Sequence, residues 1–128
     1  MNTQIQKLLI VEDNFYIRNK IEEEVKKINV FDSVYLAETI KEALEMIKNQ
    51  AIDVITLDLS LPDGCGLDIL THLRENNLQK EVFVFSMSSE MEKISIRYGA
   101  KYFFDKKNGL APIIEQFRKD YFYSNLAI

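Results

Sequence analysis

The feature that most constrains the fold of this chain is an alternation of five short apolar runs with longer amphipathic segments. The apolar runs are residues 8–11, 34–36, 54–57, 82–85 and 102–104. They are mostly rich in β-branched or aromatic residues, which is typical of buried strands. The runs therefore predict five short strands distributed along the whole chain.

The segments between the runs have the spacing of amphipathic helices. Apolar residues recur along one helical face over residues 17–28 and 67–73. Capping-box patterns, in which a hydroxyl residue is followed three positions later by glutamate, predict helix starts at residues 39–42 and 89–92. Pro112 suits the first turn of a last helix. The sequence thus predicts five helices, each following one of the strands.

Strands buried on both faces, alternating with helices, predict an α/β fold with a doubly wound parallel sheet. The chain has 128 residues, without repeats or linker-like tracts, so we expect a single domain over residues 1–128. In such open sheets, sites form beyond the carboxyl ends of the strands. That edge is therefore where functional residues are expected.

Charge, hydropathy and cysteine content exclude several functions. The net charge of −4 and the lack of a basic tail argue against direct binding of nucleic acid. The fully apolar runs are far too short for a membrane span, and the amino terminus lacks a secretory signal. Cys65 is the only cysteine, so a disulfide within the chain is impossible. We expect a cytoplasmic protein with no membrane partner.

Polar residues follow four of the five predicted strands. Glu12 and Asp13 follow the first strand, Asp58 the third, Ser86 the fourth and Lys106 the fifth. In a parallel sheet these ends share one edge, so the side chains should share a cleft. Taken singly, several have a structural explanation, since Asp13 can cap the next helix, and serine and lysine are common at such positions. Their combination at the strand ends is the functional signal.

Together these groups suit phosphoryl transfer. Clustered carboxylates repel one another, and a divalent cation relieves that repulsion. Ligands that are all oxygen favour Mg²⁺, with Mn²⁺ as an alternative. The carboxylate of Asp58 can act as a nucleophile and form an acyl phosphate. Lys106 and the metal would offset negative charge on the transferring group, and Ser86 could donate a hydrogen bond to one of its oxygens.

These residues make the chain resemble a two-component response-regulator receiver domain of the stand-alone, chemotaxis-regulator-like kind, over residues 6–118. The acidic pair of that family matches Glu12-Asp13, and its phosphoacceptor matches Asp58. Its switch hydroxyl matches Ser86, and its Gly-Ala-x-x-aromatic-x-x-Lys signature matches residues 99–106. The resemblance implies a flavodoxin-like sheet of strand order 2-1-3-4-5.

The resemblance also assigns roles to site residues. It implies that Asp13, Asp58 and the backbone carbonyl of Ser60 bind Mg²⁺ directly, while Glu12 acts mainly through water. It further implies that the rotamer of the aromatic residue Phe103 follows Ser86 when the domain switches.

Partners follow from the same resemblance. The phosphoryl donor would be a phosphohistidine on a sensor histidine kinase or a phosphotransfer protein. The chain would catalyse only its own phosphorylation and dephosphorylation, and would not be an enzyme acting on an external substrate. We expect the output to reach a downstream protein, or a second copy of the chain, through the face formed by the fourth helix, fifth strand and fifth helix.

Two residues depart from the family pattern. Lys107 stands where a proline usually follows the key lysine, commonly joined by a cis peptide, which puts the geometry of that loop in question. Met87 follows the switch hydroxyl, where a small residue is usual. Its long side chain could shield an acyl phosphate from water.

Three other functions compete with that of a stand-alone receiver. The receiver module of a larger transcription factor or hybrid kinase would carry the same residues. A phosphohydrolase of the haloacid-dehalogenase type needs Asp-x-Asp after its first strand, whereas residues 58–60 lack the second acid and follow the third. A flavodoxin-like electron carrier needs a phosphate-binding loop after its first strand. Residues 12–15 stand at that position, and their charge is opposite to the one that phosphate binding needs.

The apolar residues 120–128 fit an extended last helix, a partner or dimer surface, or a natural chain that continues.

Overall fold

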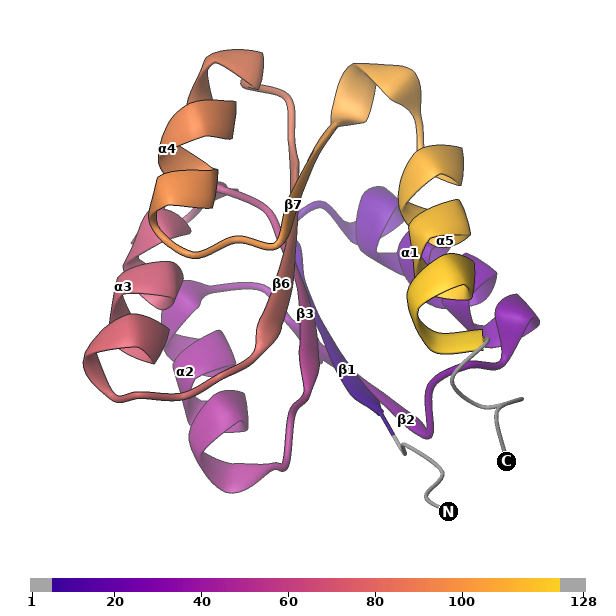
Figure 1. Ribbon diagram of the computed structural model, residues 1–128, viewed down its shortest axis with the longest axis horizontal. Helices are drawn as coiled ribbons and strands as arrows, with labels where there is room; N and C mark the ends of the chain where they lie inside the picture. The colour runs from indigo at the N-terminus through magenta and orange to yellow at the C-terminus, as the bar shows by residue number, and fades with distance from the viewer. Residues whose placement is uncertain (1–5, 123–128) are drawn as a thin grey trace.

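The sheet at the centre of the molecule has five parallel strands, and helices cover both of its faces (Figure 1). The computed structural model describes residues 6–122. The strands are β1 (Lys7–Val11), β2 (Ser33–Ala37), β3 (Val54–Leu57), β6 (Glu81–Ser86) and β7 (Tyr102–Asp105). Their order across the sheet is β2-β1-β3-β6-β7. This confirms the predicted order 2-1-3-4-5 and the doubly wound α/β class.

Five α-helices connect or follow the strands within the described residues, as predicted. They are α1 (Phe15–Ile28), α2 (Ile40–Asn49), α3 (Leu67–Glu75), α4 (Glu92–Arg97) and α5 (Ala111–Phe117). Shorter helical turns are η1 (Ser89–Met91), η2 (Lys106–Asn108) and the π-helical η3 (Arg118–Phe122). In Figure 1, α2, α3 and α4 cover one face of the sheet, and α1 and α5 cover the other.

Alternate residues of β1 enter two separate apolar layers. Leu9 and Val11 pack in the layer under α2 and α3, whereas Leu8 and Ile10 pack in the layer under α1 and α5. All four side chains are almost completely buried. Because both faces of the strand are covered, its sequence is a continuous apolar run and not an alternating one. This burial explains why short apolar runs located the strands correctly.

The predicted helix starts are correct in two cases and wrong in one. The hydroxyl of Thr39 accepts a hydrogen bond from the amide of Glu42 at 3.0 Å, as a capping box requires. Pro112 lies in the first turn of α5. The capping box predicted at residues 89–92 is absent, and α4 has no side-chain cap. The reason is that Ser89 lies within the η1 turn, whereas a capping residue needs extended backbone before the helix.

A small antiparallel hairpin follows β3. Its strands are β4 (Ser60–Leu61) and β5 (Gly64–Cys65). Asp63, at the tip, accepts hydrogen bonds from the amides of Ile40 at 2.8 Å and Lys41 at 3.1 Å. These bonds hold the pKa of Asp63 below its usual value. The hairpin is thereby attached to the start of α2.

The end of the described chain packs on the domain. Tyr121 is buried in the layer under α1 and α5, and its hydroxyl donates a hydrogen bond to the carboxylate of Glu81. The rest of the apolar segment, residues 123–128, lies outside the described residues, so its role stays a prediction. No helix within residues 6–122 is both long enough and apolar enough to cross a bilayer.

Candidate functional site

Three carboxylates meet at the carboxyl ends of β1 and β3. These strands are neighbours, with Val11 opposite Leu57, so the residues that follow them emerge side by side. The amide of Asp58 donates a hydrogen bond to the carbonyl of Val11 at 3.0 Å. One carboxylate oxygen from each of Glu12, Asp13 and Asp58 lies within 4.8 Å of the other two. The structure therefore brings the three predicted acids together.

Lys106, which follows β7, lies beside these three carboxylates, and the four side chains together form the acidic pocket. Its ammonium nitrogen lies 2.9 Å from a carboxylate oxygen of Glu12 and 3.5 Å from one of Asp58. It also lies 5.7 Å from the ring centroid of Phe85. The lysine side chain is only 8% exposed, so salt screens these ion pairs weakly. Because three carboxylates face one ammonium, the ionised pocket keeps a net negative charge.

Burial dominates the titration of Glu12. Loss of hydration raises the pKa of its carboxyl from 4.5 to about 7, the charge of Asp58 adds to this rise, and Lys106 opposes it. The amide of Asn14 donates a hydrogen bond to the carboxylate at 3.2 Å. The group is thus held in a position where its negative charge is unfavourable. A bound cation would stabilise the negative charge of this carboxylate.

The donor set fits a hard divalent cation. All three side chains offer oxygen atoms only, which favours Mg²⁺ or Mn²⁺ over zinc. Asp13 is exposed, whereas Glu12 and Asp58 are buried. The cluster is therefore open to solvent on the side of Asp13, as suits Mg²⁺, which usually keeps several water ligands. The acidic triad could hold such a metal.

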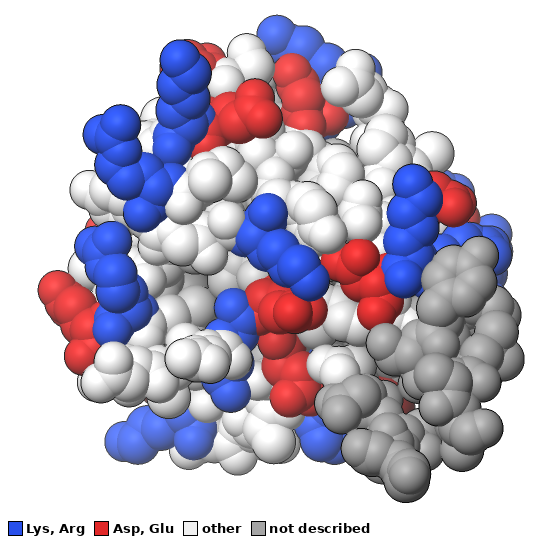
Figure 2. Space-filling model, in the orientation of Figure 1, with Lys and Arg blue, Asp and Glu red and all other residues white. Residues whose placement is uncertain are grey.

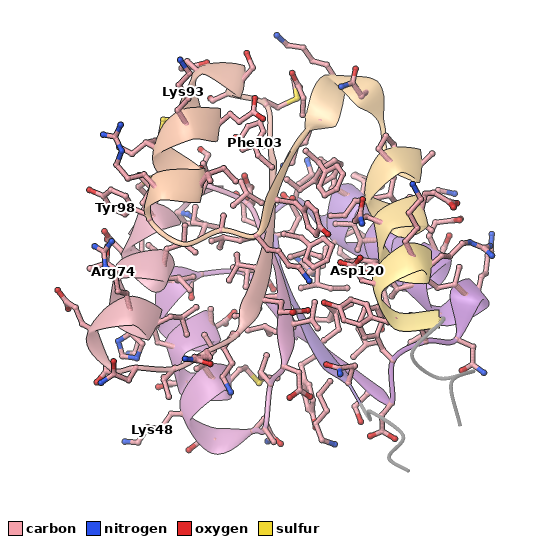
Figure 3. All side chains as sticks on the ribbon, viewed as in Figure 1. Lys48, Arg74, Lys93, Tyr98, Phe103 and Asp120 are labelled. Atoms are coloured by element: carbon pink, nitrogen blue, oxygen red, sulfur yellow. The ribbon has the colours of Figure 1, made fainter. Side chains whose placement is uncertain are left out.

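The other predicted site residues lie at or near this edge of the sheet. Ser86 is buried at the end of β6, and its hydroxyl accepts a hydrogen bond from the amide of Ser88 at 3.0 Å. Its own hydrogen thus remains available for donation. The amide of Ser60 donates a hydrogen bond to the Asp58 carboxylate at 3.2 Å. Phe103 is half-buried in β7 and packs on the layer under α2 and α3 (Figure 3). The roles assigned to these residues stay predictions.

Both residues that depart from the receiver pattern lie close to the pocket. After Lys106 the chain forms the η2 turn, in which Asp105 accepts a hydrogen bond from the amide of Lys107 at 2.8 Å. The described part of the chain contains no cis peptide bond. Met87 is 57% exposed and lines, together with Lys106, a surface pocket of about 250 Å³. Its proposed shielding of an acyl phosphate stays a prediction.

Sequence reasoning missed two residues that support the site. A Cβ atom at Gly66 would lie 2.5 Å from the carbonyl oxygen of Asp58. The signal for this close approach was a second glycine within three residues, directly after a tight turn. Arg18 is buried on α1 and its guanidinium donates hydrogen bonds to the carbonyls of Glu12 at 3.0 Å and Asp13 at 3.5 Å. Its signal was an arginine next to the apolar stripe of the first helix.

A doubly wound parallel sheet with three carboxylates and a lysine at the carboxyl ends of its strands defines a class of small phosphoacceptor signalling domains. Residues 8–118 match the family model of the response regulator receiver domain, and the chain belongs to that family. Receiver domains are phosphorylation switches of two-component signalling that interact with kinases and targets, and are not classical enzymes.

Curated relatives include both short and long proteins. The chain is 27% identical over 115 residues to the chemotaxis protein CheY of Bacillus subtilis, an alignment that covers 88% of the chain and 95% of CheY. It is 35% identical over 95 residues to the transcriptional regulatory protein MalR of the same organism, covering 73% of the chain and 40% of MalR. The chain spans about two fifths of the length of the first curated regulators it matches.

Solved structures show the same fold. The receiver domain of the Francisella response regulator 1452 matches with a TM-score of 0.80 and 26% identity, over 89% of this chain and 94% of that one. A CheX-CheY-BeF3-Mg²⁺ complex from Borrelia burgdorferi contains a chain that matches with a TM-score of 0.79 and 24% identity, over 89% of this chain and 87% of that one. At that identity the second match supports the fold alone.

Proposed function

We propose that this protein is a signalling switch that accepts a phosphoryl group on Asp58 in a Mg²⁺-dependent reaction. The observation that carries the proposal is the buried carboxylate of Asp58, which lies 3.5 Å from the ammonium of Lys106 and close to the acidic pair Glu12-Asp13. A sensor histidine kinase or a phosphotransfer protein would supply the phosphoryl group from a phosphohistidine.

The contacts of Asp58 suit a nucleophile. One carboxylate oxygen accepts the amide hydrogen of Ser60, and the other lies near the ammonium of Lys106, so both are oriented before reaction. A carboxylate oxygen attacks phosphorus, the new O–P bond forms, and the P–N bond to the donor imidazole breaks with its electron pair going to nitrogen. Lys106 would then pair with the phosphoryl oxygens, and Ser86 would donate a hydrogen bond to one of them.

The proposed metal ligands are Asp13, Asp58 and the backbone carbonyl of Ser60, with Glu12 acting through water. When bound, Mg²⁺ or Mn²⁺ would neutralise charge on the transferring phosphoryl group. The residues themselves keep the cluster poised for a cation, because Lys106 alone does not balance the three carboxylates.

The proposed output runs through α4, β7 and α5. Ser86 ends β6 just before η1 and α4, and Lys106 follows β7, so drawing both side chains toward a phosphoryl group would move the ends of these elements. Phe103 would then turn toward the space that Ser86 leaves. Shifting a two-state equilibrium from 1:99 to 99:1 takes about 5.5 kcal/mol. A few charge-assisted hydrogen bonds of about 1.5–3 kcal/mol each would supply it.

Intact-mass spectrometry with acetyl phosphate tests the phosphoacceptor. We expect the mass to rise by one phosphoryl group when Mg²⁺ or Mn²⁺ is present, and no rise in EDTA or for Asp58→Asn. Asp32→Asn is the matched control, because Asp32 pairs with Lys7 at the opposite end of β1 and should not affect labelling. Equal labelling of the Asp58→Asn variant would falsify the site.

A second proposal shares this site and concerns the whole protein. The same domain would serve as the receiver module of a longer transcription factor or hybrid kinase. The observation in its favour is that the chain spans only about two fifths of regulators such as MalR, although it spans 95% of CheY. The length of the natural open reading frame, checked by the mass of the protein in cell extracts, separates the two possibilities.

A further inference from the structure

A cationic groove lies between α3 and α4, away from the acidic pocket. This α3–α4 groove has a volume of about 290 Å³, and the described residues that line it include three with cationic side chains, Arg74, Lys80 and Arg97, and none with a carboxylate. The chain as a whole has a net charge of −4, so the groove has the opposite sign to the rest of the molecule. Figure 2 shows Lys and Arg side chains along this side of the molecule.

The three cations of the groove have no ion-pair partner within residues 6–122. The ion pairs found there all involve other lysines and Arg18. Glu81, which adjoins Lys80 in sequence, is engaged instead by Lys101 at 3.1 Å and by the hydroxyl of Tyr121. Unpaired guanidinium groups are well suited to bidentate hydrogen bonds with carboxylates.

Contacts across the groove hold one of these guanidinium groups in place. The guanidinium carbon of Arg74, on α3, lies 5.2 Å from the ring centroid of Tyr98, at the end of α4. Figure 3 shows the two side chains close together on the same side of the molecule. This cation–π contact reduces the conformational entropy that Arg74 would lose on binding a ligand. Below the charged rim, the lining is apolar and includes Leu73 and Val82.

We propose that the α3–α4 groove binds an acidic segment of a partner protein, with an apolar side chain of that segment seated between flanking carboxylates. The cationic rim complements the carboxylates, and the apolar floor complements the anchor. Duplex nucleic acid fits less well, because three cations neutralise few phosphates and the remaining surface repels them.

The position of the groove also couples it to phosphorylation of Asp58, and this coupling rests on the proposed function. One wall is α4, a helix of only six residues that follows Ser86 through the η1 turn. Neither η1 nor α4 has a side-chain cap. A shift of Ser86 toward a phosphoryl group would therefore move Arg97 and Tyr98 relative to Arg74 on α3.

Titration with a defined peptide tests the groove. The probe is the fluorescein-labelled peptide Gly-Asp-Glu-Leu-Glu-Asp-Gly, followed by fluorescence anisotropy and by amide chemical shifts of the full chain. We expect shifts centred on residues 70–82 and 97–99, and affinity that falls with salt. Arg74→Glu combined with Arg97→Glu should weaken binding at least tenfold. Lys41→Glu combined with Lys48→Glu, both exposed on α2, makes the same change in net charge outside the groove and should leave binding intact.

Several results would overturn the proposal. These are equal binding of a peptide with Asn and Gln in place of its acids, equal binding by the Arg74→Glu, Arg97→Glu variant, or shifts that map elsewhere. Both arginines are exposed, so circular dichroism should show an intact fold, and Arg74→Gln with Arg97→Gln provides a milder second variant. Tighter binding of duplex DNA, or self-association that the variants abolish, would assign the groove to a different occupant.

Beryllofluoride, a phosphoryl mimic, separates this proposal from the proposed function. Added with Mg²⁺, it should change peptide affinity several-fold, and Asp58→Asn should lose that change while still binding the peptide. Unchanged affinity in protein whose Asp58 accepts phosphate by mass would refute the coupling but not the groove. Absence of phosphorylation would refute the proposed function, and peptide binding would then be judged by the charge variants alone.

Discussion

Replacing Gly66 by alanine tests whether close packing of the hairpin positions Asp58. A Cβ atom at this position would lie 2.5 Å from the carbonyl oxygen of Asp58 and 3.0 Å from the Cα atom of Leu59. Both neighbours are backbone atoms, so a side-chain rotation does not relieve the contact. The backbone of Gly66 itself has φ −60° and ψ −16°, which alanine adopts readily. The expected loss therefore comes from the contact and not from backbone strain.

The size of the effect follows from two opposing terms. Overpacking a close contact costs about 1–3 kcal/mol, while the stiffer unfolded chain of an alanine variant contributes about 0.4–1 kcal/mol in the other direction. The expected net loss is about 1–2 kcal/mol in the free energy of unfolding. With a urea dependence of about 1–3 kcal/mol per M, the urea midpoint should fall by roughly 0.3–2 M.

Two assays on Gly66→Ala distinguish a local from a general effect. Urea unfolding, monitored by circular dichroism, measures the free energy of unfolding. The rate of acetyl phosphate labelling without urea reports whether the Asp58 carboxylate is well placed for reaction. Because displacements of about 1 Å can reduce rates about 100-fold, labelling should slow at least tenfold although the protein is folded. Cys65→Ala, at the exposed neighbouring position, should change neither quantity. A variant as stable as the parent and labelled equally fast would refute the reasoning.

Three further perturbations follow from the structure. Because the pKa of Glu12 is raised from 4.5 to about 7 on folding, the metal-free protein should lose stability as the pH rises through that window, and Glu12→Gln should remove this slope in urea titrations. Thr56→Val should increase the free energy of unfolding by about 1 kcal/mol, since the buried Thr56 hydroxyl has no hydrogen-bond partner among residues 6–122; a less stable variant would contradict this. Asp63→Asn should speed amide exchange at Ile40 and Lys41, and unchanged protection would show that the carboxylate does not hold the start of α2.

Local sequence signals located the regular elements because they reflect burial directly. The run at residues 8–11 is apolar throughout since both faces of β1 are covered. The signal failed at residues 89–92, where the capping pattern is correct in composition but the backbone is already helical at Ser89. It also missed the hairpin after β3, whose two-residue strands are too short to produce a period.

The sequence by itself determined the fold class and the candidates for the phosphoacceptor pocket. Each candidate can be recognised within a single segment: Asp58, Glu12-Asp13 and Lys106 each follow an apolar run. The parallel topology then places the ends of these strands at one edge of the sheet. The tertiary structure decided the contacts among them. The 2.9 Å pair of Lys106 with Glu12, the approach of Gly66 to Asp58 and the cation–π contact of Arg74 with Tyr98 join residues that are separate in the sequence. Periodicity records how each element is buried, whereas such contacts depend on how the elements pack against one another.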